Sequence, residues 1–246
     1  MTLCSRLFPS LVFYCRLVGI VLRTSKVARA GGFTGEKWVE SSLEVLQRLE
    51  EAGISIEISG AERLSRVAGP VVIVGNHMSM METLLLPGVI QPIKPVTFVV
   101  KESLLSYPVF KHVMQASQPI AVTRTNPRQD LKTVLGEGSV KLSNGISVIV
   151  FPQTTRSHHF DPAQMSSIGV KLAKKAGVPI VPLALQTDAW QNGRWLKDFG
   201  RLDSRKTARF AFGKPLMVEG KGDAEQTLIN GHIAERLHAW SEEAEG

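Results

Sequence analysis

The chain has 246 residues, of which 43% are hydrophobic and 7% aromatic, and it carries a formal net charge of +7. This length supports one substantial domain with a buried core and disfavours a second full domain. The positive charge suits an anionic partner. Nucleic acid is disfavoured because the few aromatic residues are not interleaved with Lys and Arg in a recognisable module. Cys4 and Cys15 have no metal-ligand or disulfide spacing, which fits a reducing compartment.

Residues 1–35 form a basic, apolar segment that we expect to anchor the chain to a membrane surface. They contain five Lys and Arg residues and no acid. The apolar run at 7–22 has about 16 residues, fewer than the roughly 20 that cross a bilayer core, so we expect it to lie in the interface. Phe8, Phe13 and Tyr14 would enter the acyl boundary while the arginines meet anionic headgroups.

A cleaved signal peptide is the alternative interpretation of the same segment. The small residues Ala28 and Ala30 have the spacing of a cleavage site. Against this interpretation, Arg16 interrupts the would-be hydrophobic region, and three further cations fill the polar stretch that should precede cleavage. We therefore retain the membrane-interface interpretation.

Seven mostly apolar segments predict β-strands, and most are continuous runs typical of strands covered on both faces. In chain order they are 54–58, 71–74, 96–100, 120–122, 147–150, 180–185 and 208–212, the first of them alternating as expected near a sheet edge. Helical patterns occur at 36–51, 80–86, 127–142 and 162–175, and a last helix contains His232, Leu237 and Trp240. The alternation of strand and helix predicts an α/β fold, with a mostly parallel central sheet of about seven strands flanked by helices.

A histidine follows the second predicted strand and precedes a helix start. Ser79 and Glu82 have the spacing of a capping box, with Ser79 as N-cap, Glu82 third in the helix, and its side chain turned back toward the entering chain. Residues i and i+5 on one helix point about 140° apart, so His77 can meet Glu82 only from that entering chain. The segment predicts a histidine base oriented by a carboxylate, with a plain helix cap and a structural histidine as the alternative.

The strand predicted at 147–150 also ends in polar side chains. Phe151 and Pro152 close it, and Gln153, Thr154, Thr155, Arg156 and Ser157 follow. In open α/β sheets, ligands bind at the carboxyl ends of the strands. The two strand ends are therefore expected to share one crevice.

These segments resemble the motifs of the glycerolipid acyltransferase family, whose best-known members acylate lysophosphatidate. The family's first motif, Asn-His, four residues, Asp, is matched by Asn76 and His77 with Glu82. Its third motif, Phe-Pro-Glu-Gly-Thr-Arg-Ser, is similar to residues 151–157. Stretches that look like its second and fourth motifs occur at 119–124 and 178–183, so four motifs follow in the family order. With the basic, apolar segment at 1–35 as the anchor, the resemblance implies an acyltransferase-like domain at 36–246.

The resemblance also implies a role for each matched residue. His77 would take the proton of a lysolipid hydroxyl, and Glu82 would hold the imidazole. The headgroup pocket would consist of Arg124, Gln153, Thr154, Thr155 and Arg156. No Gly-x-Ser-x-Gly elbow is present, which disfavours a covalent acyl-serine route.

The chain departs from the family pattern in ways that leave the acceptor open. Glu82 stands in place of Asp, Gln153 in place of Glu and Thr154 in place of Gly, and no Gly precedes Pro119. The change at Gln153 removes a negative charge close to Arg156 and so alters which headgroup is selected. The favoured acceptor is 1-acyl-glycerol-3-phosphate, and the alternative acceptors are a lyso-aminolipid or a glycolipid precursor.

The remaining expectations concern partners and location. By the resemblance, the acyl donor is acyl-CoA or an acylated carrier protein, and no cofactor or metal is expected. The expected location is the cytoplasmic face of a membrane. A non-catalytic, membrane-surface lipid-binding protein is the alternative outside enzymes.

Two further features each allow two interpretations. Lys171, Lys174 and Lys175 share one predicted helix and suit a solvated face, with a headgroup contact as the alternative. Trp190 and Trp195 suit either an interfacial loop or plain packing.

Overall fold

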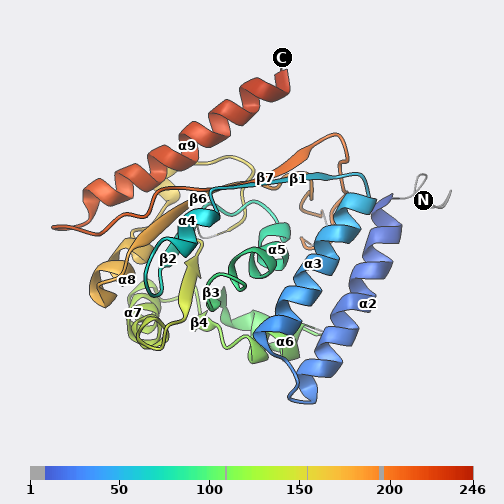
Figure 1. The fold of residues 1–246 in the computed structure, drawn as a ribbon, viewed down its shortest axis with the longest axis horizontal. Helices are drawn as coiled ribbons and strands as arrows, with labels where there is room; N and C mark the ends of the chain where they lie inside the picture. Colours follow the sequence, from blue (N-terminus) through green and yellow to red (C-terminus); the bar gives the residue numbers. More distant parts are fainter. Residues whose placement is uncertain (1–8, 109, 154, 194–196, 246) are drawn as a thin grey trace.

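The computed structural model describes residues 9–108, 110–153, 155–193 and 197–245 (Figure 1). The strands are β1 Ser55–Ser59, β2 Val72–Gly75, β3 Val96–Lys101, β4 Ile120–Val122, β5 Ser147–Val150, β6 Ile180–Gln186 and β7 Thr207–Phe212. The α-helices are α2 Pro9–Arg29, α3 Gly35–Glu51, α4 Glu62–Ser65, α5 Met81–Ile90, α6 Lys111–Ala116, α7 Pro127–Ser143, α8 Ile168–Ala176 and α9 Asp223–Glu245. Two short 3-10 helices complete the described elements, η1 Glu102–Ser106 and η2 Pro162–Gln164.

The strands form one sheet in the order β1-β7-β6-β2-β5-β3-β4. All neighbouring pairs are parallel except β6 and β7, which are antiparallel. The predicted α/β fold with a mostly parallel seven-stranded sheet is therefore confirmed. β2 and β5 are neighbours, with Val72 opposite Val148, so the two strand ends that carry the motifs lie side by side.

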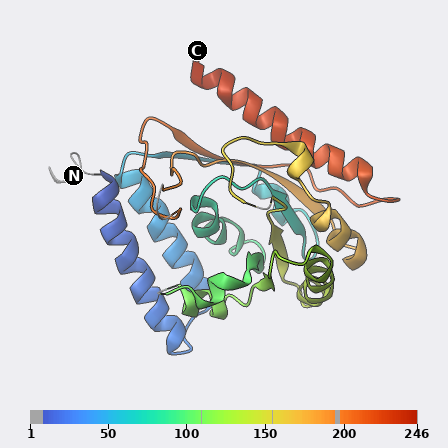
Figure 2. The ribbon, with the colours of Figure 1, turned by 180° about the vertical axis from the view of Figure 1, so that it is seen from behind.

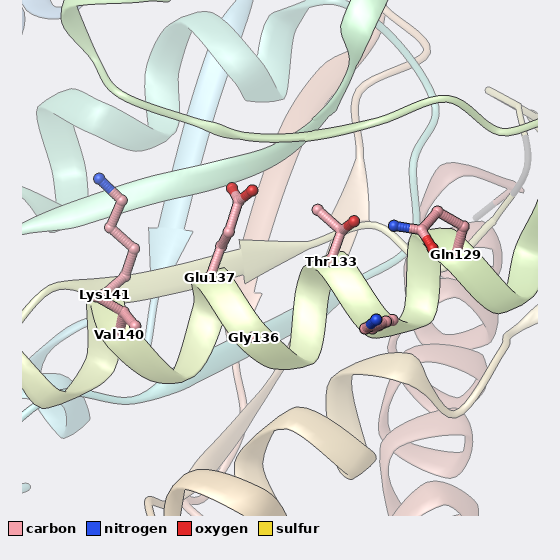
Figure 3. Close-up of a pocket in the computed structure, with 7 residues that line it drawn as sticks. Gln129, Thr133, Gly136, Glu137, Val140 and Lys141 are labelled. Carbon is pink, nitrogen blue, oxygen red and sulfur yellow. The ribbon is translucent and has the colours of Figure 1, made fainter.

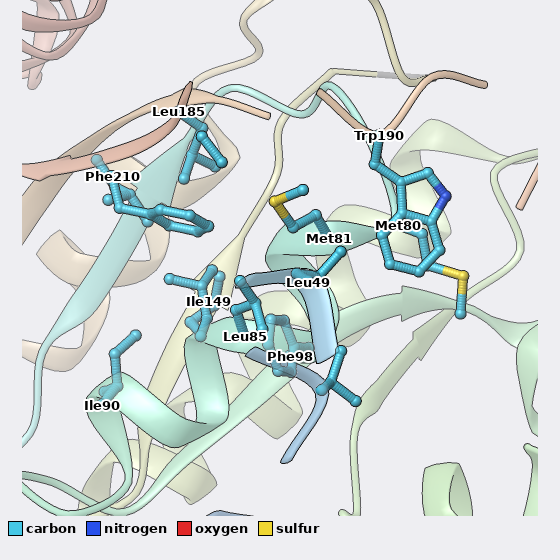
Figure 4. Close-up of a cluster of buried hydrophobic side chains, with 14 of the residues drawn as sticks. Leu49, Met80, Met81, Leu85, Ile90, Phe98, Ile149, Leu185, Trp190 and Phe210 are labelled. Atoms are coloured by element: carbon cyan, nitrogen blue, oxygen red, sulfur yellow. The ribbon is translucent and has the colours of Figure 1, made fainter. Parts of the chain in front are cut away.

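Helices cover both faces of the sheet. α2 and α3 lie side by side at one side of the molecule, while α7 and α8 lie at the other (Figures 1 and 2). Successive residues of β2 enter different cores, because side chains alternate along a strand. Ile73 belongs to the core beneath α3 and α5. Leu49, Phe98 and Phe210 of the same core are shown in Figure 4. Val72 and Val74 pack in the second core beneath α7, α8 and α9.

Helix α2 packs against the body of the protein through its aromatic residues. Phe13 is 2% exposed, and its ring lies 5.1 Å edge-on from that of Trp190. The Tyr14 hydroxyl donates a hydrogen bond to the Gly200 carbonyl. The prediction that Phe13 and Tyr14 enter a membrane is therefore wrong, and Phe8 lies outside the described residues. Trp190 is a packing residue, and Trp195 also lies outside the described residues.

The opposite stripe of α2 is apolar as well and faces outward. Leu11, Val18 and Leu22 are 63%, 42% and 53% exposed, and Cys15 is exposed between them. These four residues, which we call the α2 outer stripe, recur at helical spacing. Within the described ranges, no helix has the length and apolar character needed to cross a membrane.

Some helix boundaries differ from the sequence prediction. α5 begins at Met81, so Glu82 is its second residue, and the Ser79 hydroxyl accepts its bond from the Met81 amide, 3.1 Å away. α5 also continues past the expected end through Pro87. The single helix expected at 162–175 is instead η2 followed by α8, because Met165 adopts an extended conformation that buries its side chain.

Candidate active site

His77 lies in the turn between β2 and α5, at the carboxyl edge of the sheet. Its Nδ1 atom is 3.3 Å from Oε1 of Glu82, which it meets from the chain that enters the helix. The imidazole stacks on Phe151 at the end of β5, with ring centroids 4.5 Å apart and planes 4° from parallel. The histidine is 8% exposed, so packing holds the ring in one orientation and leaves one edge accessible.

Glu82 is fully buried but well supplied with donors. The backbone amides of Met78 and Ser79 lie 2.6 and 3.0 Å from Oε1, and the hydroxyls of Ser79 and Thr187 each lie 2.9 Å from Oε2. Burial alone would raise the pKa of the Glu82 carboxyl. The hydrogen bond and charge interaction with His77 and the bond from the Ser79 amide outweigh burial, so the pKa lies below its ordinary value. Glu82 is therefore a carboxylate near neutral pH.

Strand β6 supplies two contacts to the site that the sequence analysis did not identify. Thr187 follows the end of β6 and bonds to Glu82. The Asn76 side chain donates to the Leu185 carbonyl at 2.8 Å and accepts from the Leu185 amide at 2.9 Å, which fixes the end of β2 against β6. The polar pair Gln186 and Thr187 after the apolar run at 180–185 was the available signal for Thr187.

The turn after β5 holds the backbone of His77. The Gln153 side-chain oxygen accepts from the His77 amide at 2.6 Å, and the Ser157 amide donates to the His77 carbonyl at 2.9 Å. Gln153 is 2% exposed and does not line the cavity that contains His77, although we expected it in the headgroup pocket. Thr155 is exposed, and Thr154 lies outside the described residues.

Two arginines and an aspartate share a cavity with His77. The cavity has a volume of about 100 Å³, and its apolar walls come from β3, η1, α5 and α6. Arg124 and Arg156, which the motif resemblance assigned to a headgroup pocket, both line it. Asp198 lines it too and forms an ion pair with Arg156, with 2.6 Å between Nη1 of the arginine and Oδ1 of the aspartate. No sequence signal marked Asp198, because it lies 42 residues from its partner in a loop.

Arg124 occupies a strained backbone conformation. Its φ is +62°, in the left-handed region that non-glycine residues seldom adopt. Asp130 in α7 holds this turn by accepting from the amides of Thr123 and Arg124 at 2.9 and 2.8 Å. Burial and the charge of Arg156 lower the pKa of the Arg124 guanidinium. Backbone strain of this kind clusters at functional sites.

A larger hollow of about 540 Å³ lies elsewhere, on the outer face of α7 (Figure 3). All the described residues that line it belong to that one helix, from Gln129 to Lys141. Among the described residues, no second element and no histidine line this hollow. The histidine that pairs with a carboxylate lines the smaller cavity at the sheet edge instead.

Comparison with known proteins identifies the family of this chain. The model of the family described as Acyltransferase matches residues 55–186, which include His77, Glu82, Arg124 and Arg156. A 1-acyl-sn-glycerol-3-phosphate acyltransferase of Pseudomonas aeruginosa is 31% identical over 193 residues, covering 78% of this chain and 69% of the relative. A probable 1-acyl-sn-glycerol-3-phosphate acyltransferase of Mycoplasma pneumoniae is 30% identical over 136 residues, covering 54% of this chain and 50% of the relative.

A solved structure shares the fold. The crystal structure of PlsC, the 1-acyl-sn-glycerophosphate acyltransferase of Thermotoga maritima, aligns with a TM-score of 0.61 and 20% identity, covering 94% of this chain and 97% of that one. The chain belongs to the acyltransferase family, which confirms the resemblance to that family. Within that family it is a glycerolipid O-acyltransferase.

Proposed function

We propose that this enzyme transfers a fatty acyl group from acyl-CoA or an acylated carrier protein to the hydroxyl of 1-acyl-glycerol-3-phosphate at a membrane surface. The observation that carries the proposal is the pair of His77 and Glu82 in one cavity with Arg124 and Arg156. The names of the relatives support the choice of acceptor. The two arginines of the cavity support it too, because a guanidinium group can form paired hydrogen bonds with phosphate oxygens.

The proposed chemistry follows from which nitrogen of His77 is occupied. Glu82 takes Nδ1–H, which leaves Nε2 as the base for the acceptor hydroxyl. As the oxygen attacks the thioester carbonyl, its proton passes to Nε2, and the ionised Glu82 stabilises the imidazolium. The tetrahedral intermediate then expels the thiolate, which recovers the proton from His77. The products are an ester and a free thiol.

A second acceptor class is favoured by Asp198. Its carboxylate neutralises part of the charge of Arg156 inside the cavity that should receive a phosphate. A headgroup that carries an ammonium beside an anionic group would match this arrangement, with the anion at Arg124 and the ammonium at Asp198. A lyso-aminolipid is therefore the second candidate acceptor.

A panel of acceptors separates the two candidates. We expect acyl-CoA or an acylated carrier to acylate 1-acyl-glycerol-3-phosphate faster than a lyso-aminolipid, with Asp198→Asn lowering the KM for the phosphate acceptor because Arg156 loses a competitor. Product formation can be followed by mass spectrometry and thiol release. A preference for the aminolipid, lost in Asp198→Asn, would select the second candidate. Failure to acylate any lysolipid would contradict the proposed function.

We propose that the α2 outer stripe contacts the membrane. Replacing Leu11, Val18 and Leu22 together by Ser should move the protein from anionic vesicles to the supernatant, since each buried leucine contributes roughly 1.5–3 kcal/mol. Their outward direction predicts an almost unchanged thermal midpoint. Leu228, 56% exposed on α9, provides the control, and Leu228→Ser should sediment like the parent. If the triple variant still sediments, another surface binds the membrane.

A further inference from the structure

A second hollow lies at the same carboxyl edge, on the face of the sheet opposite the His77 cavity. It has a volume of about 330 Å³ and lies between the ends of β4 and β5 and the first turns of α7 and α8. Its walls are largely apolar, from Val122, Leu131, Val150 and Ile168. Val122, Val150 and Ile168 pack with the second core, whereas the apolar lining of the His77 cavity comes mostly from the first. We call this hollow the α7–α8 groove.

The groove and the cavity share part of their lining. Val99, Arg124 and Phe151 line both of them. Phe151 stacks on the His77 ring, and Arg124 is the residue held at a positive φ. The shared lining favours one extended molecule, with its reacting atom at His77 and its other end beyond Arg124 in the groove.

The groove combines apolar walls with a cationic rim. Lys171, on α8, is exposed at this rim and has no ion pair among the described residues. Ser167 precedes α8 without capping it, which leaves its hydroxyl and the first amides of the helix available to an anion. Asp130 is the acid among the described lining residues. Both its oxygens already accept bonds from the turn at Thr123 and Arg124.

The hollows on the two faces of the sheet have different surroundings. The His77 cavity opens among η1 and α6, and α6 packs against α2, which carries the apolar outer stripe. A lipid acceptor would therefore enter from that face. The α7–α8 groove lies on the other face, so it suits a water-soluble ligand that is apolar along its length and phosphorylated at its far end.

We propose that the α7–α8 groove holds the phosphopantetheine arm of the acyl donor, with the thioester at His77 and the phosphate at Lys171. This inference rests on the proposed function, and it names the site of the second substrate. Acyl-CoA and an acylated carrier protein share this arm. Lys171 is then a donor-binding residue instead of part of a solvated face.

Direct binding tests the groove without turnover. Desulfo-CoA can be titrated calorimetrically into the full chain carrying His77→Ala, alone and with a second substitution. Lys171→Glu should weaken binding by about tenfold, as expected for loss of one charge-assisted phosphate contact and its reversal to repulsion. Lys175→Glu makes the same charge change on the same helix, outside the groove, and should have less than about a twofold effect. Equal weakening by both, or no binding to the parent, would overturn the inference.

Steady-state kinetics identify the source of the arm. With Lys171→Glu, the donor KM should rise about tenfold for acyl-CoA, for the acylated carrier, or for both, while the acceptor KM stays constant. An acyl N-acetylcysteamine thioester lacks the phosphate, so its kcat/KM should not change. Equal losses with this thioester would overturn the inference. The two proposals can fail separately. If no lysolipid is acylated, but Lys171→Glu weakens desulfo-CoA binding and Lys175→Glu does not, the proposed function is contradicted while the assignment of the groove as a phosphopantetheine site is supported.

Discussion

Replacing His77 by Ala is expected to lower kcat by about 10²–10⁴-fold, the range that general acid-base catalysis contributes. The acceptor hydroxyl would then have no group to receive its proton, while the arginines of the cavity would still bind substrate. KM for both substrates should therefore change little. Thiol release from the donor under saturating conditions measures the effect.

The fold of this variant should survive. His77 contributes the stacking on Phe151 and one bond to Glu82, which keeps its backbone and hydroxyl donors. The expected cost is about 1 kcal/mol. His159→Ala is the matched control, because that histidine is exposed in the loop after β5 and does not line the cavity. Retained turnover in His77→Ala would remove this histidine from the mechanism.

Replacing Glu82 by Gln is expected to cost up to about 10⁴-fold in kcat, or roughly 5 kcal/mol of transition-state stabilisation. A neutral amide cannot stabilise the imidazolium. It also favours the wrong tautomer if its NH₂ group faces Nδ1. Glu82→Asp should retain much more activity because it keeps the carboxylate. kcat of the three forms on one acceptor measures the difference.

Stability separates this role from that of a helix cap. The Gln oxygen can face the amides of Met78 and Ser79, and its NH₂ group can face the hydroxyls of Ser79 and Thr187, which can rotate to accept. The thermal midpoint at neutral pH should therefore fall only modestly. A Gln variant as active as the parent would show that Glu82 only caps α5.

The pH dependence of stability has a defined sign. The pKa of Glu82 is depressed in the folded protein, so its contribution is fully present above the unfolded value near 4.3 and is lost as the pH falls through the folded value. The parent should lose more stability in this acid range than Glu82→Gln does. Thermal melts of both forms from neutral to acid pH provide the comparison.

The sequence predicted the fold well because the central strands β2, β5 and β6 are buried on both faces. Their continuous apolar runs have few alternative interpretations, and the strand ends follow directly from the polar residues that close them. The pairing of His77 with Glu82 was also predictable, since it depends on local geometry across five residues. Thr187 and Asp198 were missed because their partners lie 105 and 42 positions away.

The sequence could not predict which side of a segment is buried where both sides have similar residues. α2 has one apolar stripe that includes Phe13 and another that includes Leu11, and only the packing of Trp190 decides which one is buried. Gln153 presents a similar ambiguity, because a residue just past a strand can turn to either side. In the structure its side chain turns to the His77 amide.

The loop between β6 and β7 contacts both helix α2 and the His77 cavity. Its residue Gly200 accepts the bond from Tyr14 on α2, and two positions earlier Asp198 pairs with Arg156 in the cavity. A displacement of α2 would therefore be transmitted through Gly200 to Asp198 and so to Arg156 in the cavity. Assays in detergent and on vesicles should then differ in acceptor KM even when donor KM agrees. The choice of assay medium thus becomes an experimental variable in its own right.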